Sequence, residues 1–127
     1  MNIVLVFLGG GFGAVIRYLV GMSWMRVNGP GQPYMATAII NVTGSLIMGL
    51  LIGFLARQAG GVSDRWRLLL GVGVLGGYTT FSSFSLEAVM MLERKAYGVA
   101  AAYVLGSVIL GVLGLILGLM IMRRLPL

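Results

Sequence analysis

The stretch GGYTTFSSFS, residues 76–85, decides the fold of this chain. It places a glycine pair and five serine or threonine side chains inside a segment that is otherwise apolar enough to lie in lipid. We expect a helix break at Gly76–Gly77, because each glycine costs about 1 kcal/mol of helix propensity and the following threonines can hydrogen-bond the freed carbonyls. Such a break must be buried in protein or face a watery cavity. The alternative is an unbroken helix whose hydroxyls bond to the carbonyl four residues earlier.

The composition is that of an integral membrane protein. Of 127 residues, 59% are hydrophobic and 9% are charged, and the mean hydropathy is +1.03. The net charge is +6, but the nine basic residues lie singly or in pairs at the ends of apolar runs, which indicates membrane-edge anchors and no nucleic-acid surface. The sequence has no cysteine and no histidine, which excludes thiolate chemistry and a near-neutral proton shuttle. We therefore expect no enzyme.

Four apolar stretches are long enough to cross a bilayer as helices. A hydrocarbon core of about 30 Å requires about 20 helical residues. No basic leader or cleavage site precedes the first stretch, so we expect it to be a retained span. The sequence predicts an all-α membrane protein with one four-helix domain, residues 1–127, whose spans are about 3–22, 35–56, 68–92 and 97–122.

The charges in the connections give only a weak preference for one orientation. Five basic residues fall on one side and three on the other. Because positive loops prefer the cytoplasmic side, such a small difference permits insertion in both orientations. We therefore expect an antiparallel, dual-topology homodimer. The two sets are Arg57, Arg65, Arg67, Arg123 and Arg124 against Arg26, Arg94 and Lys95.

Glycines recur at four-residue spacing in three of the spans. Such spacing lets helix backbones approach closely, which matters in lipid because apolar burial gives no drive between helices. The pattern has two interpretations, tight packing inside one bundle or a dedicated dimer seam, and the first is the more frequent one. The pairs are Gly9/Gly13, Gly49/Gly53 and Gly114/Gly118.

The broken span is a candidate ion site. Half-helices that meet inside a membrane present amides at one end and carbonyls at the other. Phe81 and Phe84 are three residues apart, so they share a helix face, with Thr80 alongside. An aromatic ring has a positive edge, which can touch an anion without the full charge that would bind it too tightly. The alternative is that both rings pack in the bundle or face lipid.

A few polar residues in the other spans extend this site. Asn41 lies between Thr37 and Ser45 on one stripe that lines a path or hydrogen-bonds a neighbouring helix. Arg17 and Glu87 lie deep enough to serve a vestibule or to snorkel toward the membrane surface. The Tyr103 hydroxyl, in the fourth span, needs a partner.

These residues resemble the Fluc (CrcB) family of fluoride channels. The resemblance rests on GGYTTFSSFS, which is highly specific, and on three supporting motifs in the other spans. It covers essentially the whole chain, in length and in the order of the four spans. Many members carry a smaller or aliphatic residue at Tyr78, and we expect this difference to leave function unchanged. The supporting motifs are GAVIRY (13–18), NVTGS (41–45) and AAYVLGS (101–107).

The resemblance implies a passive channel that exports cytoplasmic fluoride across the inner membrane. It implies an antiparallel homodimer with two pores, to each of which both subunits contribute, and a central sodium ion held by the backbone carbonyls of Gly76 and Thr79. The partners would be a second copy, fluoride and membrane lipid. The implied pore residues are Phe81, Phe84, Asn41, Ser83, Thr80 and Tyr103, and the implied vestibule residues are Arg17 and Glu87.

Two other function classes fit parts of the pattern. A small proton-coupled multidrug exporter of the four-helix, dual-topology type needs a membrane-embedded carboxylate, typically in the first span. Residues 3–22 contain no acidic residue, and Glu87 is the only carboxylate within the four predicted spans. A purely structural membrane subunit or holin needs no polar stripe that converges on a glycine break.

Overall fold

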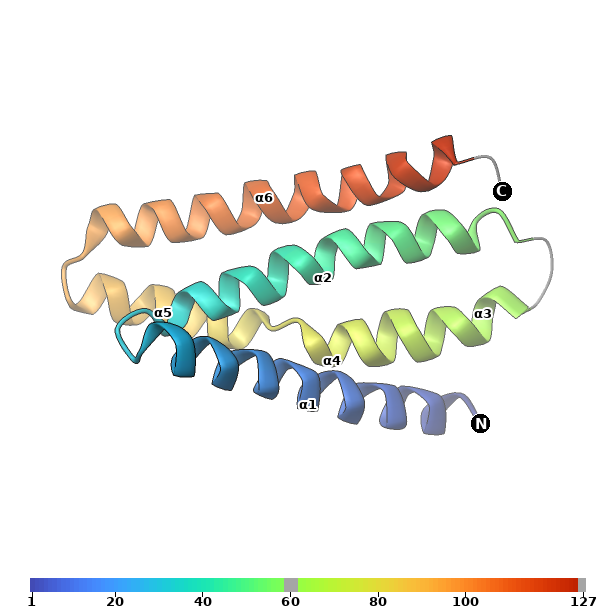
Figure 1. The fold of residues 1–127 in the computed structure, drawn as a ribbon, viewed down its shortest axis with the longest axis horizontal. Coiled ribbons are helices and arrows are strands. Elements are labelled where there is room, and N and C mark those ends of the chain that lie inside the picture. The colour runs from blue at the N-terminus through green and yellow to red at the C-terminus, as the bar shows by residue number, and fades with distance from the viewer. Residues whose placement is uncertain (59–61, 126–127) are drawn as a thin grey trace.

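The computed structural model describes residues 1–58 and 62–125, and every regular element in these ranges is a helix. The helices run side by side, and the start of the first helix and the end of the last lie at the same end of the bundle (Figure 1). Residues 59–61 and 126–127 lie outside the described residues, and the connection between the second and third predicted spans is helical from Val62 onward. The elements are α1 (Asn2–Asn28), α2 (Pro33–Leu55), α3 (Val62–Trp66), η1 (Arg67–Leu75), α4 (Gly76–Tyr78), α5 (Phe81–Glu93) and α6 (Tyr97–Arg124).

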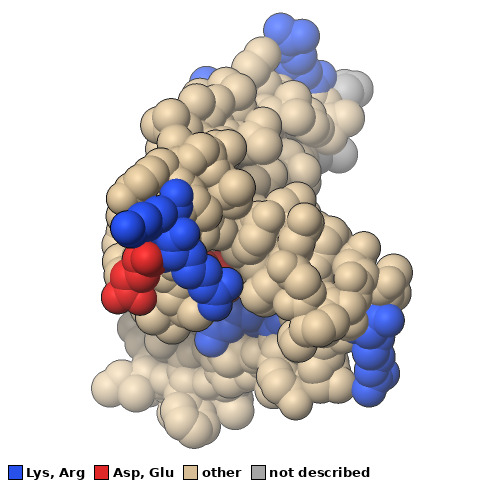
Figure 2. Space-filling model, turned by 90° about the vertical axis from the view of Figure 1, so that its left-hand side faces the viewer, with Lys and Arg blue, Asp and Glu red and all other residues tan. Residues whose placement is uncertain are grey.

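Over the described part of the chain, four helical segments are long and apolar enough to cross a membrane, which confirms the prediction of an all-helical, four-span protein. Charged side chains are sparse even at the end of the bundle where α1 meets α2 and α5 meets α6 (Figure 2). This distribution is that of a multi-pass membrane protein. The segments are Asn2–Asn28, Pro33–Leu55, Asp64–Glu93 and Tyr97–Arg124.

A short connection folds α2 back on α1. Gly29 ends α1 with a positive φ of 74°, a conformation that suits glycine. Pro33 begins α2 at a position where its missing amide hydrogen costs nothing. The Trp24 indole nitrogen donates to the Gln32 carbonyl at 3.1 Å and ties the end of α1 to this connection.

Each glycine pair has at least one member where two helices touch backbone to backbone. A Cβ added at Gly13 would overlap the carbonyl of Val74 on η1, and one added at Gly49 would overlap the carbonyl of Leu115 on α6. In the same contact between α2 and α6, a Cβ added at Gly118 on α6 would overlap the backbone of α2. The glycine pattern therefore serves packing inside the bundle, the first of its two interpretations.

The third apolar segment is interrupted, but not at the glycines. Gly76–Tyr78 is helical, and the backbone becomes extended at Thr79 (φ −78°, ψ 159°) and Thr80 (φ −150°, ψ 119°). The expected break at Gly76–Gly77 was therefore placed too early. The reason is packing: a Cβ at Gly77 would overlap the carbonyl of Gly10, so this glycine is needed for contact with α1 rather than for a turn.

The segment before the break is wound more widely than an α-helix. Arg67–Leu75 forms a π-helix, and the Gly76 amide still donates to the Gly71 carbonyl five residues earlier. Gly71 and Gly73 are buried in this segment. The wide winding and the absent side chains bring the η1 backbone against α1, where a Cβ at Gly73 would lie 3.0 Å from the Gly9 Cα.

Gly13→Ala should destabilise the protein, because its methyl group has no space beside the Val74 carbonyl. Overpacking of this kind costs about 1–3 kcal/mol, and thermal unfolding in detergent should show a clearly lower midpoint. Gly11→Ala is the matched control on the same helix, since nothing lies within 4 Å of its added Cβ. Equal midpoints for the two variants would contradict the packing of α1 on η1.

Candidate ion site at the helix break

The break is held by the Asn41 carboxamide. Asn41 Oδ1 accepts a hydrogen bond from the Thr80 amide at 2.8 Å, and Asn41 Nδ2 donates to the Thr80 carbonyl at 2.9 Å. In an unbroken helix, the Thr80 amide would instead donate to the Gly76 carbonyl. Asn41 therefore satisfies both backbone groups of Thr80 and leaves the Gly76 carbonyl without its helical donor.

The Thr80 side chain starts the second half-helix. Thr80 is buried, and its Oγ1 accepts from the Ser83 amide at 3.2 Å, which makes Thr80 the N-cap of α5. The Thr80 hydroxyl also lies 3.1 Å from Ser83 Oγ, to which it donates. The positive end of the α5 dipole and two hydroxyl groups consequently gather at one point.

Arg17 reaches the break from α1. Its Nη1 donates to the Thr79 carbonyl at 3.2 Å. The Thr79 hydroxyl turns the other way and donates to the Leu75 carbonyl at 2.8 Å, closing the end of α4. A carbonyl oxygen has two lone pairs, so the contact with Arg17 leaves the Thr79 carbonyl one acceptor position.

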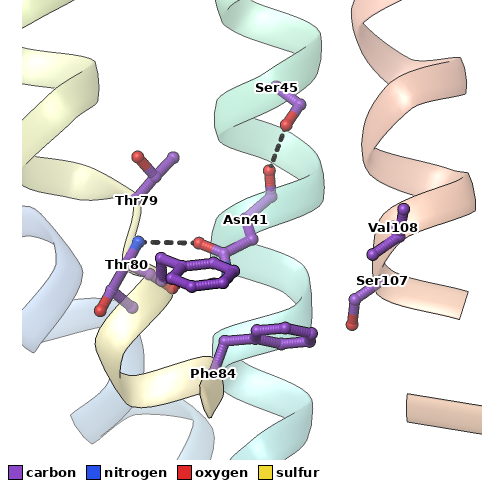
Figure 3. A pocket seen from close by; sticks show the side chains of 8 residues that line it. Asn41, Ser45, Thr79, Thr80, Phe84, Ser107 and Val108 are labelled. Atoms are coloured by element: carbon purple, nitrogen blue, oxygen red, sulfur yellow. Dashed lines mark hydrogen bonds between the residues drawn. The ribbon is translucent and has the colours of Figure 1, made fainter. Parts of the chain in front are cut away.

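A pocket of about 270 Å³ opens on one side of the break. The Phe84 ring extends across this pocket from α5 toward Ser107 on α6, and Asn41 on α2 lies above it in this view (Figure 3). The centroids of Phe81 and Phe84 are 5.7 Å apart with their planes tilted by 37°. Phe81 is 79% exposed, so this pocket is not closed by a single chain. The lining residues are Asn41, Ser45, Thr79, Thr80, Phe81, Phe84, Ser107 and Val108.

A second pocket, of about 220 Å³, lies on the other side of Thr80. Arg17 and Glu87 both line it, so the structure brings together the two charged residues expected in a vestibule. Ser83 and Thr37 supply its hydroxyl groups. Because Thr80 lines both pockets, its side chain separates the charged pocket from the aromatic one.

Tyr103 on α6 contacts a residue of each pocket, Glu87 of the charged pocket and Phe84 of the aromatic one. The Tyr103 hydroxyl donates to Glu87 Oε2 at 2.6 Å, and the Thr37 hydroxyl donates to Glu87 Oε1 at 2.9 Å. The Tyr103 ring is buried and packs on Phe84 with centroids 5.2 Å apart. The partner required by the Tyr103 hydroxyl is therefore Glu87, and Glu87 is held by two neutral donors.

All the predicted pore and vestibule side chains thus gather around one break, but the sequence interpretation gave no role to Ser107. Its hydroxyl is buried and has no hydrogen-bond partner among the described residues. Ser107 lies four residues after Tyr103 on α6, so it shares a helix face with that tyrosine. The four-residue spacing between Tyr103 and Ser107 is a sequence pattern that could have predicted Ser107 as a residue of this site.

The arrangement offers an ion several uncharged donors and two kinds of helix end. The Ser83 hydroxyl hydrogen, the second Asn41 amide hydrogen and the positive end of α5 suit an anion, whereas the carbonyls that end α4 suit a cation. Over the described residues, no group of three His, Cys, Asp or Glu side chains can hold a metal. A cation here would have neutral oxygens available from the backbone and from hydroxyl and amide side chains, the ligand type of hard ions.

Comparison with known proteins identifies a family. Residues 4–119 match the model of the family described as CrcB-like protein, Camphor Resistance (CrcB). The chain is 54% identical over 122 residues to a fluoride-specific ion channel FluC of Phenylobacterium zucineum, covering 96% of this chain and 95% of the relative. It is 50% identical over 123 residues to a FluC of Caulobacter vibrioides, covering 97% and 96%. The chain belongs to the CrcB-like family.

Proposed function

We propose that this protein is a fluoride-specific ion channel, and that its function is passive conduction and not catalysis. The observation that carries the proposal is the cluster of uncharged donors around Asn41 and Thr80, in a chain 54% identical to a relative named as a fluoride-specific ion channel. The break, the aromatic pocket and the charged pocket all lie around this cluster.

Fluoride is small and strongly hydrated, so a selective path must replace its water with several donors at once. The Ser83 hydroxyl, which accepts from Thr80 and keeps its own hydrogen, and the second amide hydrogen of Asn41 are neutral donors in the two pockets that meet at Thr80. A neutral set lets the ion leave, because binding that is too strong stops conduction. Arg17 attracts anions into the charged pocket, while its contact with the Thr79 carbonyl keeps it beside the break.

Phe81 and Phe84 contribute the edges of their rings. Ring edges carry positive partial charge, and both rings line the pocket that contains Asn41. Phe84 is held in place by its contact with Tyr103, whereas Phe81 is 79% exposed in the single chain. A path lined by both rings therefore requires a second surface over Phe81.

The second surface belongs to another copy of the chain, inserted in the opposite orientation. Five basic residues at one end against three at the other permit both insertions. In the resulting antiparallel homodimer, the subunits enclose two pores and each pore uses residues of both. Membrane lipid covers the remaining apolar surface.

A sodium ion at the centre of this dimer would stabilise the breaks. The Gly76 carbonyl has lost its helical donor to Asn41, and the Thr79 carbonyl keeps one acceptor position, so each subunit can supply two oxygens. Hard monovalent cations favour such ligands, and the residues fit the ion on this basis. When bound, sodium supplies positive charge that offsets the aligned carbonyl dipoles at the ends of α4.

The direction of flow follows from the membrane potential. Hydrogen fluoride crosses membranes uncharged and ionises in a neutral cytoplasm, which traps the anion. A potential that is negative inside drives an anion outward by about 2.3 kcal/mol per 100 mV. A passive channel in the inner membrane therefore lowers cytoplasmic fluoride and its toxicity without energy coupling.

A proton-coupled multidrug exporter is disfavoured by the geometry. Helix α1 carries no acidic residue. Glu87 in α5 has both oxygens engaged, one by Thr37 and one by Tyr103. A carboxylate that exchanges protons for a cationic substrate would have to break or rearrange these two hydrogen bonds in each cycle.

The function is tested with the purified protein in liposomes loaded with potassium fluoride, with valinomycin to set the potential and a fluoride electrode outside. Fluoride efflux should depend on the imposed potential and should exceed chloride efflux by at least about 100-fold, because the neutral donors replace the water of fluoride better than that of the larger ion. Equal permeation of fluoride and chloride would overturn the proposal.

Phe84→Ile and Phe81→Ile should each lower fluoride throughput about tenfold or more while the protein still elutes as a folded dimer. The loss of a ring edge removes stabilisation of the ion, and about 1.4 kcal/mol corresponds to a factor of ten. The matched control is Phe12→Ile, a 61% exposed phenylalanine on α1, outside both pockets. Wild-type fluoride flux in both Phe81→Ile and Phe84→Ile would contradict the proposal that the ring edges stabilise the ion.

Asn41→Asp should lower fluoride flux about 100-fold. The aspartate keeps the acceptor for the Thr80 amide but loses the donor and adds a negative charge, and two like charges about 4 Å apart repel by about 4 kcal/mol near a protein surface. Asn28→Asp, at the exposed end of α1, is the control and should conduct normally. Unchanged fluoride flux in Asn41→Asp would contradict the proposal that Asn41 lines the ion path.

A further inference from the structure

Tyr78, the last residue of α4, makes a directed hydrogen bond to α2. Its hydroxyl lies 3.0 Å from Thr43 Oγ1. The Thr43 hydroxyl has one hydrogen, and its shortest contact is with the Ile39 carbonyl at 2.6 Å. Thr43 therefore donates to its own helix and accepts from Tyr78, so the Tyr78 hydroxyl is the donor.

The Tyr78 ring is seated against the same turn of α2. A Cβ added at Gly44 would lie 3.3 Å from Tyr78 Cδ1 and would overlap the methyl group of Thr79. Gly44 is buried and Tyr78 is partly buried. The absence of a side chain at Gly44 thus admits the ring, and the hydroxyl then reaches Thr43, the preceding residue.

The two ends of the break are consequently fastened to one turn of α2. Thr80 is held by Asn41 through both backbone groups, and Tyr78 is held by Thr43, two residues farther along that helix. Thr79 lies between these attachments, with its carbonyl toward Arg17. The Tyr78 attachment is a side-chain hydrogen bond between α4 and the helix that holds Thr80, so its removal loosens α4 relative to Asn41 while the contact of Gly77 with α1 remains.

We infer that Tyr78 is a positioning residue for ion conduction. Its hydroxyl fixes the register of α4 against α2 and so keeps the Asn41 carboxamide and the Thr80 hydroxyl facing the pocket they line. Tyr78 itself lines neither pocket, so it acts through these residues and not on the ion. The inference rests on the proposed channel function, and it replaces the expectation that a tyrosine at this position has no effect.

Tyr78→Phe removes the hydroxyl and keeps the ring. Fluoride efflux per folded dimer in potassium fluoride liposomes should fall about fivefold, the effect expected for the loss of one hydrogen bond that sets a geometry. Thr43→Val removes the acceptor and should cause a similar loss, whereas Thr43→Ser keeps it and should conduct like wild type. The Tyr78→Phe/Thr43→Val pair should conduct no worse than either single variant, because both remove the same bond. Tyr97→Phe, 62% exposed at the start of α6, is the matched control.

Each outcome has a definite reading. Wild-type flux in Tyr78→Phe overturns the inference, and so does a double variant whose losses multiply, since the two residues would then act separately. A lower unfolding midpoint with unchanged flux per folded dimer also overturns it, because the bond would then be structural only. A wild-type protein that carries no fluoride refutes the proposed function instead, so the two failures are distinguishable.

Discussion

The interaction on which the site depends is the pair of hydrogen bonds between the Asn41 carboxamide and the backbone of Thr80. Backbone groups freed by a break cost several kcal/mol each in hydrocarbon unless they find partners. A single asparagine supplies a donor and an acceptor in the right geometry, as a neighbouring strand would. This pairing makes an extended segment tolerable inside an apolar helix, and it also ties the break to α2.

The placement of the other functional groups follows from that pairing. Because the Thr80 backbone is satisfied by Asn41, its hydroxyl is free to cap α5 and to bond Ser83. Capping starts α5 at Phe81, which brings Phe81 and Phe84 onto the pocket that Asn41 lines. The same shift removes the helical donor of the Gly76 carbonyl. One side-chain contact thus creates donors for an anion on one side and free carbonyls on the other.

Much of this was predictable from the sequence because it depends on local chemistry. Span length and hydropathy predicted four apolar helices, and glycine spacing predicted close helix contacts. The predicted position of the break was wrong because a glycine pair is typical of a flexible backbone and of close helix packing alike. At Gly77 the structure shows close packing, against Gly10 of α1. The pairing of Tyr78 with Thr43 depends on the register between α4 and α2, which no spacing within either segment contains.

A structure of the full-length protein in lipid nanodiscs, determined by electron cryo-microscopy, tests the central claim most directly. We predict that the Asn41 carboxamide contacts both the amide and the carbonyl of Thr80, and that Thr79 and Thr80 are extended in every subunit. An unbroken helix in which the Thr80 amide donates to the Gly76 carbonyl, with Asn41 turned away, would contradict it.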